Sequence, residues 1–354
     1  MTDPASLRDI DGFYARDIAD LIASADPEKK NLLSKIAKMT VEHRRFVEAK
    51  DWLDEHLLES GIGREATCGL IYGPPGVGKS TILRRFAKKF GGPFETREGT
   101  RRPVLRVITP GDPNLGNLYS AILRALDADE LANGRNPEKK TAVQTQLGIQ
   151  NVKLLIFDEF THTVEDRTEK FTKKPLREIK ELLSENHCQC VFAGTEELVK
   201  LHELYEQFHR RSGGDYHFTT FDWTDGGDRG EWEEILEGIS DELPIKPMLA
   251  LNRQQRPHQL HFVTGGIMDN LMKFLLRATA LAYDEGQEFL SEDHLWHAFE
   301  RMRRGDKQKK NPFQQPKSRP AKPRVIQDED EDDELSGLWS IGSERKAPPE
   351  KFNK

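Results

Sequence analysis

The pattern of apolar and polar positions predicts strands that alternate with helices over the middle of the chain. Four short apolar runs have the length of strands: Cys68–Tyr72, Val104–Ile108, Val152–Phe157 and Gln189–Ala193. The third run is apolar almost throughout, which is typical of a central parallel strand covered on both faces. Between the runs, apolar positions recur at helical spacing in Ser80–Phe90, in Leu115–Leu126 and from Leu176 to Leu183. This order predicts a parallel sheet with right-handed helical crossovers.

Helical spacing also predicts helices before and after this α/β region. Val41–Ser60 carries its apolar residues on one side and is followed by glycines that end the helix. From about Gly230 onward the strands give way to helices at Glu231–Ile239, Gly266–Tyr283 and Glu292–Met302. Beyond Gly305 the chain is rich in Pro, Lys, Gln and Asp and has little to bury, so we expect that part to be disordered.

The composition is that of a soluble globular protein. The 354 residues are 36% hydrophobic and 32% charged. No apolar run reaches the roughly 18 residues of a membrane span, and the first residues lack the features of a secretory signal. Three cysteines cannot form a disulfide framework. We therefore expect a cytoplasmic protein without a membrane partner, in which Cys188 and Cys190 pack inside a strand rather than bind a metal.

The charges are unevenly distributed, so the net charge says little about partners. Removing the seven acidic residues at 328–334 from the net charge of −7 leaves the rest of the chain near neutrality. Just upstream, residues 301–324 hold ten Lys or Arg and a single acid, Asp306. A basic segment followed by an acidic block is therefore expected after a roughly neutral folded part.

A glycine-rich segment, GPPGVGKS from Gly73 to Ser80, lies between a predicted strand and a predicted helix. This spacing matches the Walker A phosphate loop, in which backbone N–H groups and a helix N-terminus bind phosphates. Lys79 is then expected to reach the β- and γ-phosphates of ATP, and Ser80 to ligate Mg²⁺. The predicted ATP-binding residues are Gly73, Pro74, Pro75, Gly76, Val77, Gly78, Lys79, Ser80 and Thr81.

Two acids, Asp158 and Glu159, follow the apolar run at Val152–Phe157. The carboxyl end of a parallel strand is where α/β sheets bind ligands. We therefore predict that Asp158 binds the Mg²⁺ shell and that Glu159 orients or deprotonates the attacking water. The alternative, that the two acids only begin a solvated loop, is weakened by the phosphate loop upstream.

The glycine-rich loop, the two acids and the helices that follow the α/β region resemble those of the AAA+ class of P-loop NTPases. The chain has neither the N-K-x-D sequence that reads guanine nor the LSGGQ signature of transporter ATPases. By the resemblance, Thr195 takes the sensor-1 position, although it also suits the N-cap of the following helix. Arg210 or Arg211 is the candidate arginine finger for a neighbouring subunit; the alternative is a charge that stabilises a helix end. The sequence does not choose between the two arginines.

Four segments in this order resemble the TnsC/TniB family of transposition regulators: GKSTILRRFAKKFGG, RPVLRVITPGDPNLGNLYSAILRAL, LLIFDEF and CVFAGTEELVKL. The resemblance runs from about Val41 to Met302. It implies an AAA+ ATPase that oligomerises on double-stranded DNA with ATP, marks a target site and recruits a transposase. The chain departs from the family in having Phe160-Thr161-His162 after its two acids, and no sensor-2 arginine in residues 264–269.

The resulting prediction is an AAA+ P-loop NTPase with a parallel sheet flanked by helices, a C-terminal helical lid and a disordered tail. The expected parts are an N-terminal helical segment (1–60), a nucleotide-binding domain (61–229), a lid (230–305) and a charged tail (306–354). The expected partners are DNA, further copies of the chain in a ring or filament, a transposase and a target-selector protein. The alternatives are an ATPase of replication initiation or helicase loading, and a non-hydrolysing nucleotide-switched scaffold.

Two further features leave alternatives open. The tail contains LSGLWSIG, Leu335 to Gly342, which is apolar enough to dock on a basic partner, the alternative being an inert solubilising tail. Several basic residues are candidates for DNA phosphates, with a solvated surface as the alternative: Arg101, Arg102, Lys170, Lys173 and Lys174.

Overall fold

The computed structural model describes residues 26–60, 66–97, 99–112, 114–163, 169–204, 214–303 and 310–314, which belong to one compact unit, residues 1–315. The candidate fingers Arg210 and Arg211, and the tail from residue 315 with its Leu335–Gly342 peptide, lie outside the described residues. Within the described ranges, no helix combines the length and the apolar character needed to span a membrane.

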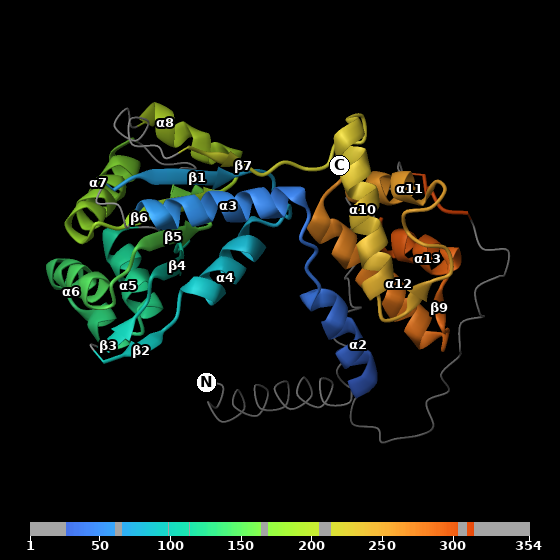
Figure 1. The fold of residues 1–354 in the computed structure, drawn as a ribbon, viewed down its shortest axis with the longest axis horizontal. Coiled ribbons are helices and arrows are strands. Elements are labelled where there is room, and N and C mark those ends of the chain that lie inside the picture. Colours follow the sequence, from blue (N-terminus) through green and yellow to red (C-terminus); the bar gives the residue numbers. More distant parts are fainter. Residues whose placement is uncertain are drawn as a thin grey trace, which may run out of the picture. The chain divides into compact units, whose positions relative to one another are not determined.

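A five-stranded sheet in the order β4-β5-β6-β1-β7 forms the centre of the α/β part (Figure 1). Its strands are β1 (Cys68–Tyr72), β4 (Val104–Ile108), β5 (Leu154–Asp158), β6 (Gln189–Gly194) and β7 (Tyr216–His217). All neighbouring pairs are parallel. The carboxyl ends of β1, β5 and β6 therefore meet at one edge of the sheet, with Tyr72 opposite Gly194 and Asp158 opposite Ile108.

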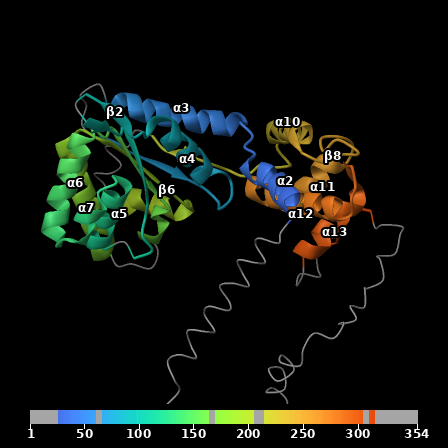
Figure 2. The ribbon, with the colours of Figure 1, turned by 90° about the horizontal axis from the view of Figure 1, so that it is seen from below.

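Helices cover both faces of this sheet, as Figure 2 shows. The α/β helices are α3 (Arg44–Glu59), α4 (Lys79–Phe90), α5 (Leu115–Ala125), α6 (Asn136–Ile149), α7 (Glu169–Asn186) and α8 (Lys200–Leu204). Side chains of β5 alternate between two cores: Leu154 and Ile156 pack with α3 and α4, and Leu155 and Phe157 with α5, α6 and α7. Alternation on a fully buried strand explains why β5 is apolar from Leu154 to Phe157.

A third core lies among helices α2 (Pro27–Lys38), α10 (Gly226–Glu242), α11 (Arg256–Thr264), α12 (Met268–Asp284) and α13 (Glu292–Met302). Trp232, Phe274 and Leu260 are fully buried there. Ile36 of α2 belongs to the same core, so the N-terminal helices divide: α2 packs with α12, while α3 packs on the sheet. Two short strands, β8 (Lys246–Pro247) and β9 (Phe289–Leu290), pair beside these helices.

The segment just before the tail also packs on the helical core. Phe313 is 4% exposed and stacks on Phe274, and the Asn311 side chain donates to the carbonyl of Trp296. Disorder was expected from residue 306 on the basis of its polar composition. Residues 310–314 instead pack against the helical core, because the ring of Phe313 is buried there and Asn311 donates to Trp296 and Glu300 of α13.

Several elements differ from the sequence-based expectation. The hairpin of β2 (Phe94–Thr96) and β3 (Gly99–Arg101) and helix α6 were not expected, since neither has a regular apolar period. The helix expected over Gly266–Tyr283 begins only at Met268, because Gly265 and Gly266 adopt the left-handed conformation that ends α11. The described residues of the α/β part also contain the 3₁₀ turns η1 (Asp129–Asn133), η2 (Phe160–Thr163) and η3 (Glu196–Val199).

Candidate functional site

The glycine-rich loop leaves β1 and enters α4 at the carboxyl edge of the sheet. Gly78 is the N-cap residue of α4 with φ of 121°, a conformation that side chains rarely adopt, and it provides no side-chain cap. At Gly73 a Cβ atom would lie 2.0 Å from the carbonyl oxygen of Phe218. Glycine is therefore required at both positions, and the first N–H groups of α4 are left without a side-chain cap at the end of the loop.

Lys79 is buried at the start of α4, and its ammonium group is held by the loop itself. Nζ donates to the carbonyl oxygens of Gly73 at 2.7 Å and Pro74 at 2.8 Å. Burial lowers the pKa of Lys79 to about 8, although the nearby carboxylates of Asp158 and Glu196 act in the opposite direction. A buried cation bonded only to neutral carbonyl groups is suited to an anionic ligand.

Asp158 ends β5 and its carboxylate accepts hydrogen bonds on both oxygens. Oδ1 accepts from the Ser80 hydroxyl at 3.1 Å and from the Glu159 N–H at 3.0 Å. Oδ2 accepts from Nε and Nη2 of Arg106, on the neighbouring strand β4, at 3.0 and 2.6 Å. Because Asp158 is 2% exposed, these donors fix its orientation, with one oxygen directed to Ser80.

Glu159 directly follows β5 and has the left-handed φ of 60°. A non-glycine residue in this conformation is strained, and such strain is concentrated at functional sites. The residue is exposed and lines the same cavity as Lys79 and Ser80. The backbone thus turns the side chain of Glu159 to the cavity while that of Asp158 stays buried.

Thr195 follows β6 and is bound to a residue that the sequence did not indicate, Thr161. The Thr161 hydroxyl accepts a hydrogen bond from the Thr195 N–H at 2.7 Å and lies 3.3 Å from its hydroxyl. Thr195 is the N-cap residue of η3, but its hydroxyl contacts the Glu197 carboxylate and caps no backbone N–H. Both threonines line the cavity.

Two cavities meet at the glycine-rich loop. The smaller, of about 360 Å³, holds the polar groups described above and is lined by Pro75, Gly76, Gly78, Lys79, Ser80, Thr81, Asp158, Glu159, Thr161, Gly194, Thr195 and Asp269. The larger, of about 670 Å³, extends past Gly76 and Thr81 to the chain just before α3 and to Met268 and Met272 of α12. The smaller cavity is therefore polar, and the larger cavity beside it is partly apolar.

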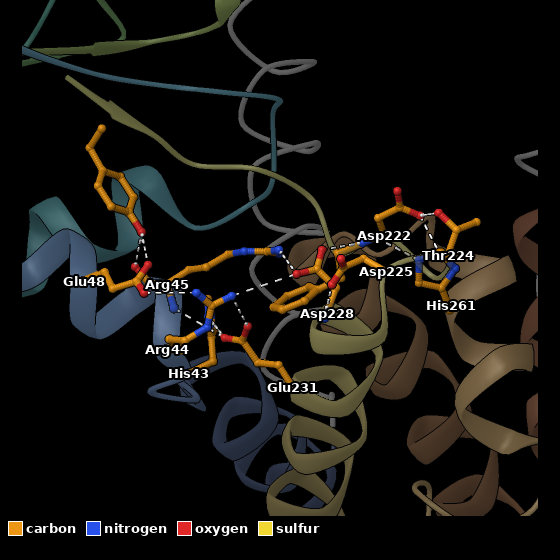
Figure 3. A network of polar contacts seen from close by, with 12 residues as sticks. His43, Arg44, Arg45, Glu48, Asp222, Thr224, Asp225, Asp228, Glu231 and His261 are labelled. Carbon is orange, nitrogen blue, oxygen red and sulfur yellow. Dashed lines mark hydrogen bonds and ion pairs between the residues drawn. The ribbon is translucent and has the colours of Figure 1, made fainter.

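His43 lines the larger cavity and belongs to a polar network between α3 and α10, shown in Figure 3. Its Nδ1 lies 3.4 Å from the buried carboxylate of Glu231. Burial lowers the pKa of His43, and Glu231 partly offsets the shift. Arg45 adds a nearly buried ion pair to Asp228 and lies over the ring of Phe221. The start of α3 is thereby joined to the start of α10 beside the cavity.

The structure thus brings most of the predicted site residues together. Pro75, Gly76, Gly78, Lys79, Ser80, Thr81, Asp158, Glu159 and Thr195 line the smaller cavity, and Val77 lines the larger. Gly73 and Pro74 line neither, but their carbonyl oxygens hold Lys79. Arg106, Thr161 and Asp269 were missed. Arg106 could have been noticed as the one charged position in the apolar strand VLRVI.

The other residues singled out in the sequence have structural contacts. Cys188 and Cys190 are fully buried, as expected, and burial raises the pKa of Cys188 to about 12. The Arg102 side chain is only 12% exposed and contacts Ala125 and Asp127, which leaves little of it for another partner. Arg101 donates to the Ile149 carbonyl. The side chains of Lys170, Lys173 and Lys174 are not among those described.

The residues present fit a nucleotide with a magnesium ion. The uncapped start of α4 and the buried ammonium of Lys79 suit phosphate oxygens. The hydroxyl of Ser80, bonded to the Asp158 carboxylate, presents oxygen ligands of the kind that Mg²⁺ prefers. Among the described residues no group of three or more His, Cys, Asp or Glu forms a metal site of its own. Ser80 and Asp158 would hold Mg²⁺ together with oxygens of water or of a ligand.

The fold is that of the AAA+ proteins. The chain resembles the Aeropyrum pernix ORC2 protein in ADPNP–ADP complexes, with a TM-score of 0.53 and 19% identity, over 72% of this chain and 66% of that one. It resembles Cdc6p from Pyrobaculum aerophilum with a TM-score of 0.55 and 14% identity, over 75% of this chain and 69% of that one. It resembles the Aeropyrum pernix ORC1 protein in complex with DNA with a TM-score of 0.51 and 17% identity, over 74% of this chain and 66% of that one. The chain thus spans about two thirds of the length of these proteins.

The family follows from the sequence itself. The family described as "Bacterial TniB protein" matches residues 35–218, more than half of the chain. This protein therefore belongs to the TniB family of AAA+ proteins. No curated protein sequence matches the chain at a significant level.

Proposed function

We propose that this protein is an ATPase that binds and hydrolyses ATP at the glycine-rich loop and thereby regulates DNA transposition. The observation that carries the proposal is the single cavity in which Lys79, Ser80, Asp158, Glu159 and Thr195 meet. These residue types, in this order along a parallel sheet, are those that P-loop enzymes use for phosphoryl transfer. Membership of the TniB family supports the assignment to transposition.

Each residue has a distinct task in this proposal. Lys79 and the N–H groups at the start of α4 bind the phosphates, and the loop carbonyls of Gly73 and Pro74 release the ammonium group as phosphate replaces them. Mg²⁺, when bound, neutralises negative charge on the phosphates. Ser80 and Asp158 hold this ion, Glu159 orients the attacking water, and Thr195 contacts the terminal phosphate.

The partners are argued from the family and from the fold. ATP sites of AAA+ assemblies lie between subunits, so we propose that Arg210 or Arg211 of one subunit completes the site of its neighbour. The resulting ring or filament binds double-stranded DNA and recruits a transposase and a target selector. DNA binding is then linked to assembly and to hydrolysis. It is expected to tolerate different sequences and to weaken with salt, as phosphate-directed binding does.

ATP turnover with and without duplex DNA tests the proposal. The wild-type protein is expected to hydrolyse ATP, and Glu159→Gln is expected to bind ATP while hydrolysis slows by at least about 100-fold. Glu237→Gln is a control, since Glu237 is exposed on α10 and lines neither cavity. Rapid turnover by Glu159→Gln would remove this residue from its role, and a wild type that binds but never hydrolyses ATP would favour a nucleotide-switched scaffold.

The helicase-loading alternative shares the AAA+ core and the DNA partner with this proposal, and the chain also resembles ORC and Cdc6 proteins. At 14–19% identity that likeness concerns the fold alone. Purification of the tagged protein with ATP and DNA from cells that contain both candidate partners separates the two functions. The proposal predicts that a transposase is retained, and retention of a replicative helicase instead would contradict it.

A further inference from the structure

Asp269, in the first turn of α12, lies against the glycine-rich loop. Its N–H donates to the carbonyl of Gly76 at 3.0 Å, which ties this turn of α12 to the loop. The carboxylate also lies near the loop, since a Cβ atom placed on Gly76 would be 3.6 Å from Oδ2 of Asp269. The backbone contact therefore places Asp269 beside the loop, with its carboxylate near Gly76.

The carboxylate stands where the two cavities meet. Among the described residues, four line both cavities: Gly76, Gly78, Thr81 and Asp269. Because the glycines bring no side chain, Thr81 and Asp269 supply the side chains at this junction. The smaller cavity contains Lys79, Ser80 and Asp158 and suits phosphates, and the larger contains Met268 and Met272 and suits a base.

The charge of Asp269 argues against a phosphate as its ligand. One oxygen, Oδ2, pairs with Nζ of Lys273 at 2.5 Å, one turn further along α12. Oδ1 accepts no hydrogen bond from the described residues. A carboxylate opposes a phosphate group but accepts hydrogen bonds from hydroxyl groups, and the uncharged diol of a ribose lies between the base and the phosphates of a nucleotide.

We propose that Asp269 recognises the ribose of the nucleotide through its 2′- and 3′-hydroxyl groups, so that the site discriminates ribonucleotides from deoxyribonucleotides. This inference rests on the proposed nucleotide site. Both cavities must be occupied at once, with the phosphates at Lys79 and the base beside Met268. Asp269 then determines the sugar specificity, and the Gly76 contact keeps its carboxylate at the junction.

Binding affinities test the inference without reference to hydrolysis. The full-length protein is titrated calorimetrically with ATP, 2′-deoxy-ATP, 3′-deoxy-ATP and GTP, all with Mg²⁺. The wild type is expected to bind ATP about tenfold or more tightly than either deoxynucleotide, the loss that follows when a hydrogen bond to a charged group is removed. In Asp269→Ala this ratio is expected to fall to near one, while the ratio of ATP to GTP affinity stays as in the wild type.

Lys273→Met is the matched control, because it removes the ion pair and keeps the carboxylate. It is expected to retain the wild-type preference for ATP over the deoxynucleotides. The thermal midpoint of Asp269→Ala checks that the helical core is intact. Equal binding of ATP and deoxy-ATP by the wild type, or an unchanged ratio in Asp269→Ala, would overturn the inference. Failure of the wild type to bind any nucleotide would instead overturn the proposed function on which it rests.

Discussion

The guanidinium group of Arg106 holds one oxygen of the Asp158 carboxylate through two nitrogens, at 3.0 and 2.6 Å. Arg106 lies in the middle of β4, and Asp158 ends the neighbouring parallel strand β5. The other oxygen of Asp158 faces Ser80. Arg106 therefore acts through Asp158: it fixes the carboxylate so that Oδ1, rather than Oδ2, is presented at the proposed Mg²⁺ position.

Replacement of Arg106 by Gln is expected to weaken Mg²⁺ binding by about tenfold, as is usual when a residue that orients a metal ligand is changed. The measurement is the Mg²⁺ concentration at half-maximal binding of a fluorescent ATP analogue. Arg106→Lys, which keeps the charge but not the two-nitrogen contact, should give an intermediate value. An unchanged Mg²⁺ requirement in Arg106→Gln would show that Asp158 needs no such support.

Lys79 makes nucleotide binding dependent on pH. Its pKa is lowered to about 8, against 10.5 for an ordinary lysine, so the amine is largely neutral at about pH 9. A bound phosphate raises this pKa again, so binding takes up a proton and ATP affinity falls as the pH rises above about 8. Calorimetry at about pH 9 in two buffers of different ionisation enthalpy measures the uptake. Lys79→Arg, which stays charged, should show none; equal uptake by both proteins would assign the proton to another group.

Thr161 positions Thr195 by accepting its N–H. Thr161→Val leaves that donor without its partner, which is expected to cost about 1–2 kcal/mol in the free energy of unfolding. It should also lower the rate of hydrolysis more than it changes ATP affinity, because Thr195 lies beside the terminal phosphate in our proposal. Thr161→Ser retains the hydroxyl and should behave like the wild type. Loss of activity in both variants to the same extent would point to packing instead of the hydrogen bond.

The ion pair of Arg45 and Asp228 contributes to the connection between α3 and α10 (Figure 3). Their side chains are only 9% and 13% exposed, so either charge alone is left nearly buried when the other is removed. Arg45→Met is expected to lower the free energy of unfolding by about 3 kcal/mol. The double variant with Asp228→Asn, which removes the second charge but can still accept the Asp222 N–H, should recover part of the loss. Urea unfolding measures both. A double variant less stable than the single one would mean that the charges are not the cause.

The sequence predicted those parts of the structure in which local pattern and tertiary environment agree. The strand from Cys68 to Tyr72, the strand from Val104 to Ile108 and the helix from Glu292 to Met302 have the expected bounds. At the site, the positions of Lys79, Ser80, Asp158 and Glu159 follow from the loop spacing and the order of the strands. Residues of this kind can be predicted because each belongs to a short sequence motif that is recognisable without knowledge of the tertiary structure.

Contacts between distant segments were not predictable in this way. Arg106, Thr161 and Asp269 each reach the site from a different element, and their partners depend on strand order and on the packing of α12. Helix α6 was missed because its buried positions are few, Val143 and Leu147 among polar residues. The domain boundaries at residues 60, 229 and 305 and the roles of Arg210 and Arg211 stay predictions.

The central claim is that ATP held by Lys79 drives assembly of this protein on DNA. The most direct measurement is sedimentation of the full-length protein with duplex DNA, with and without ATP and Mg²⁺, for the wild type and for Lys79→Ala. Lys89→Ala, a change on the same helix outside both cavities, serves as the control. The account predicts large DNA-bound assemblies for the wild type and the control only with ATP, and none for Lys79→Ala. ATP-dependent assemblies of Lys79→Ala equal to those of the wild type would contradict it.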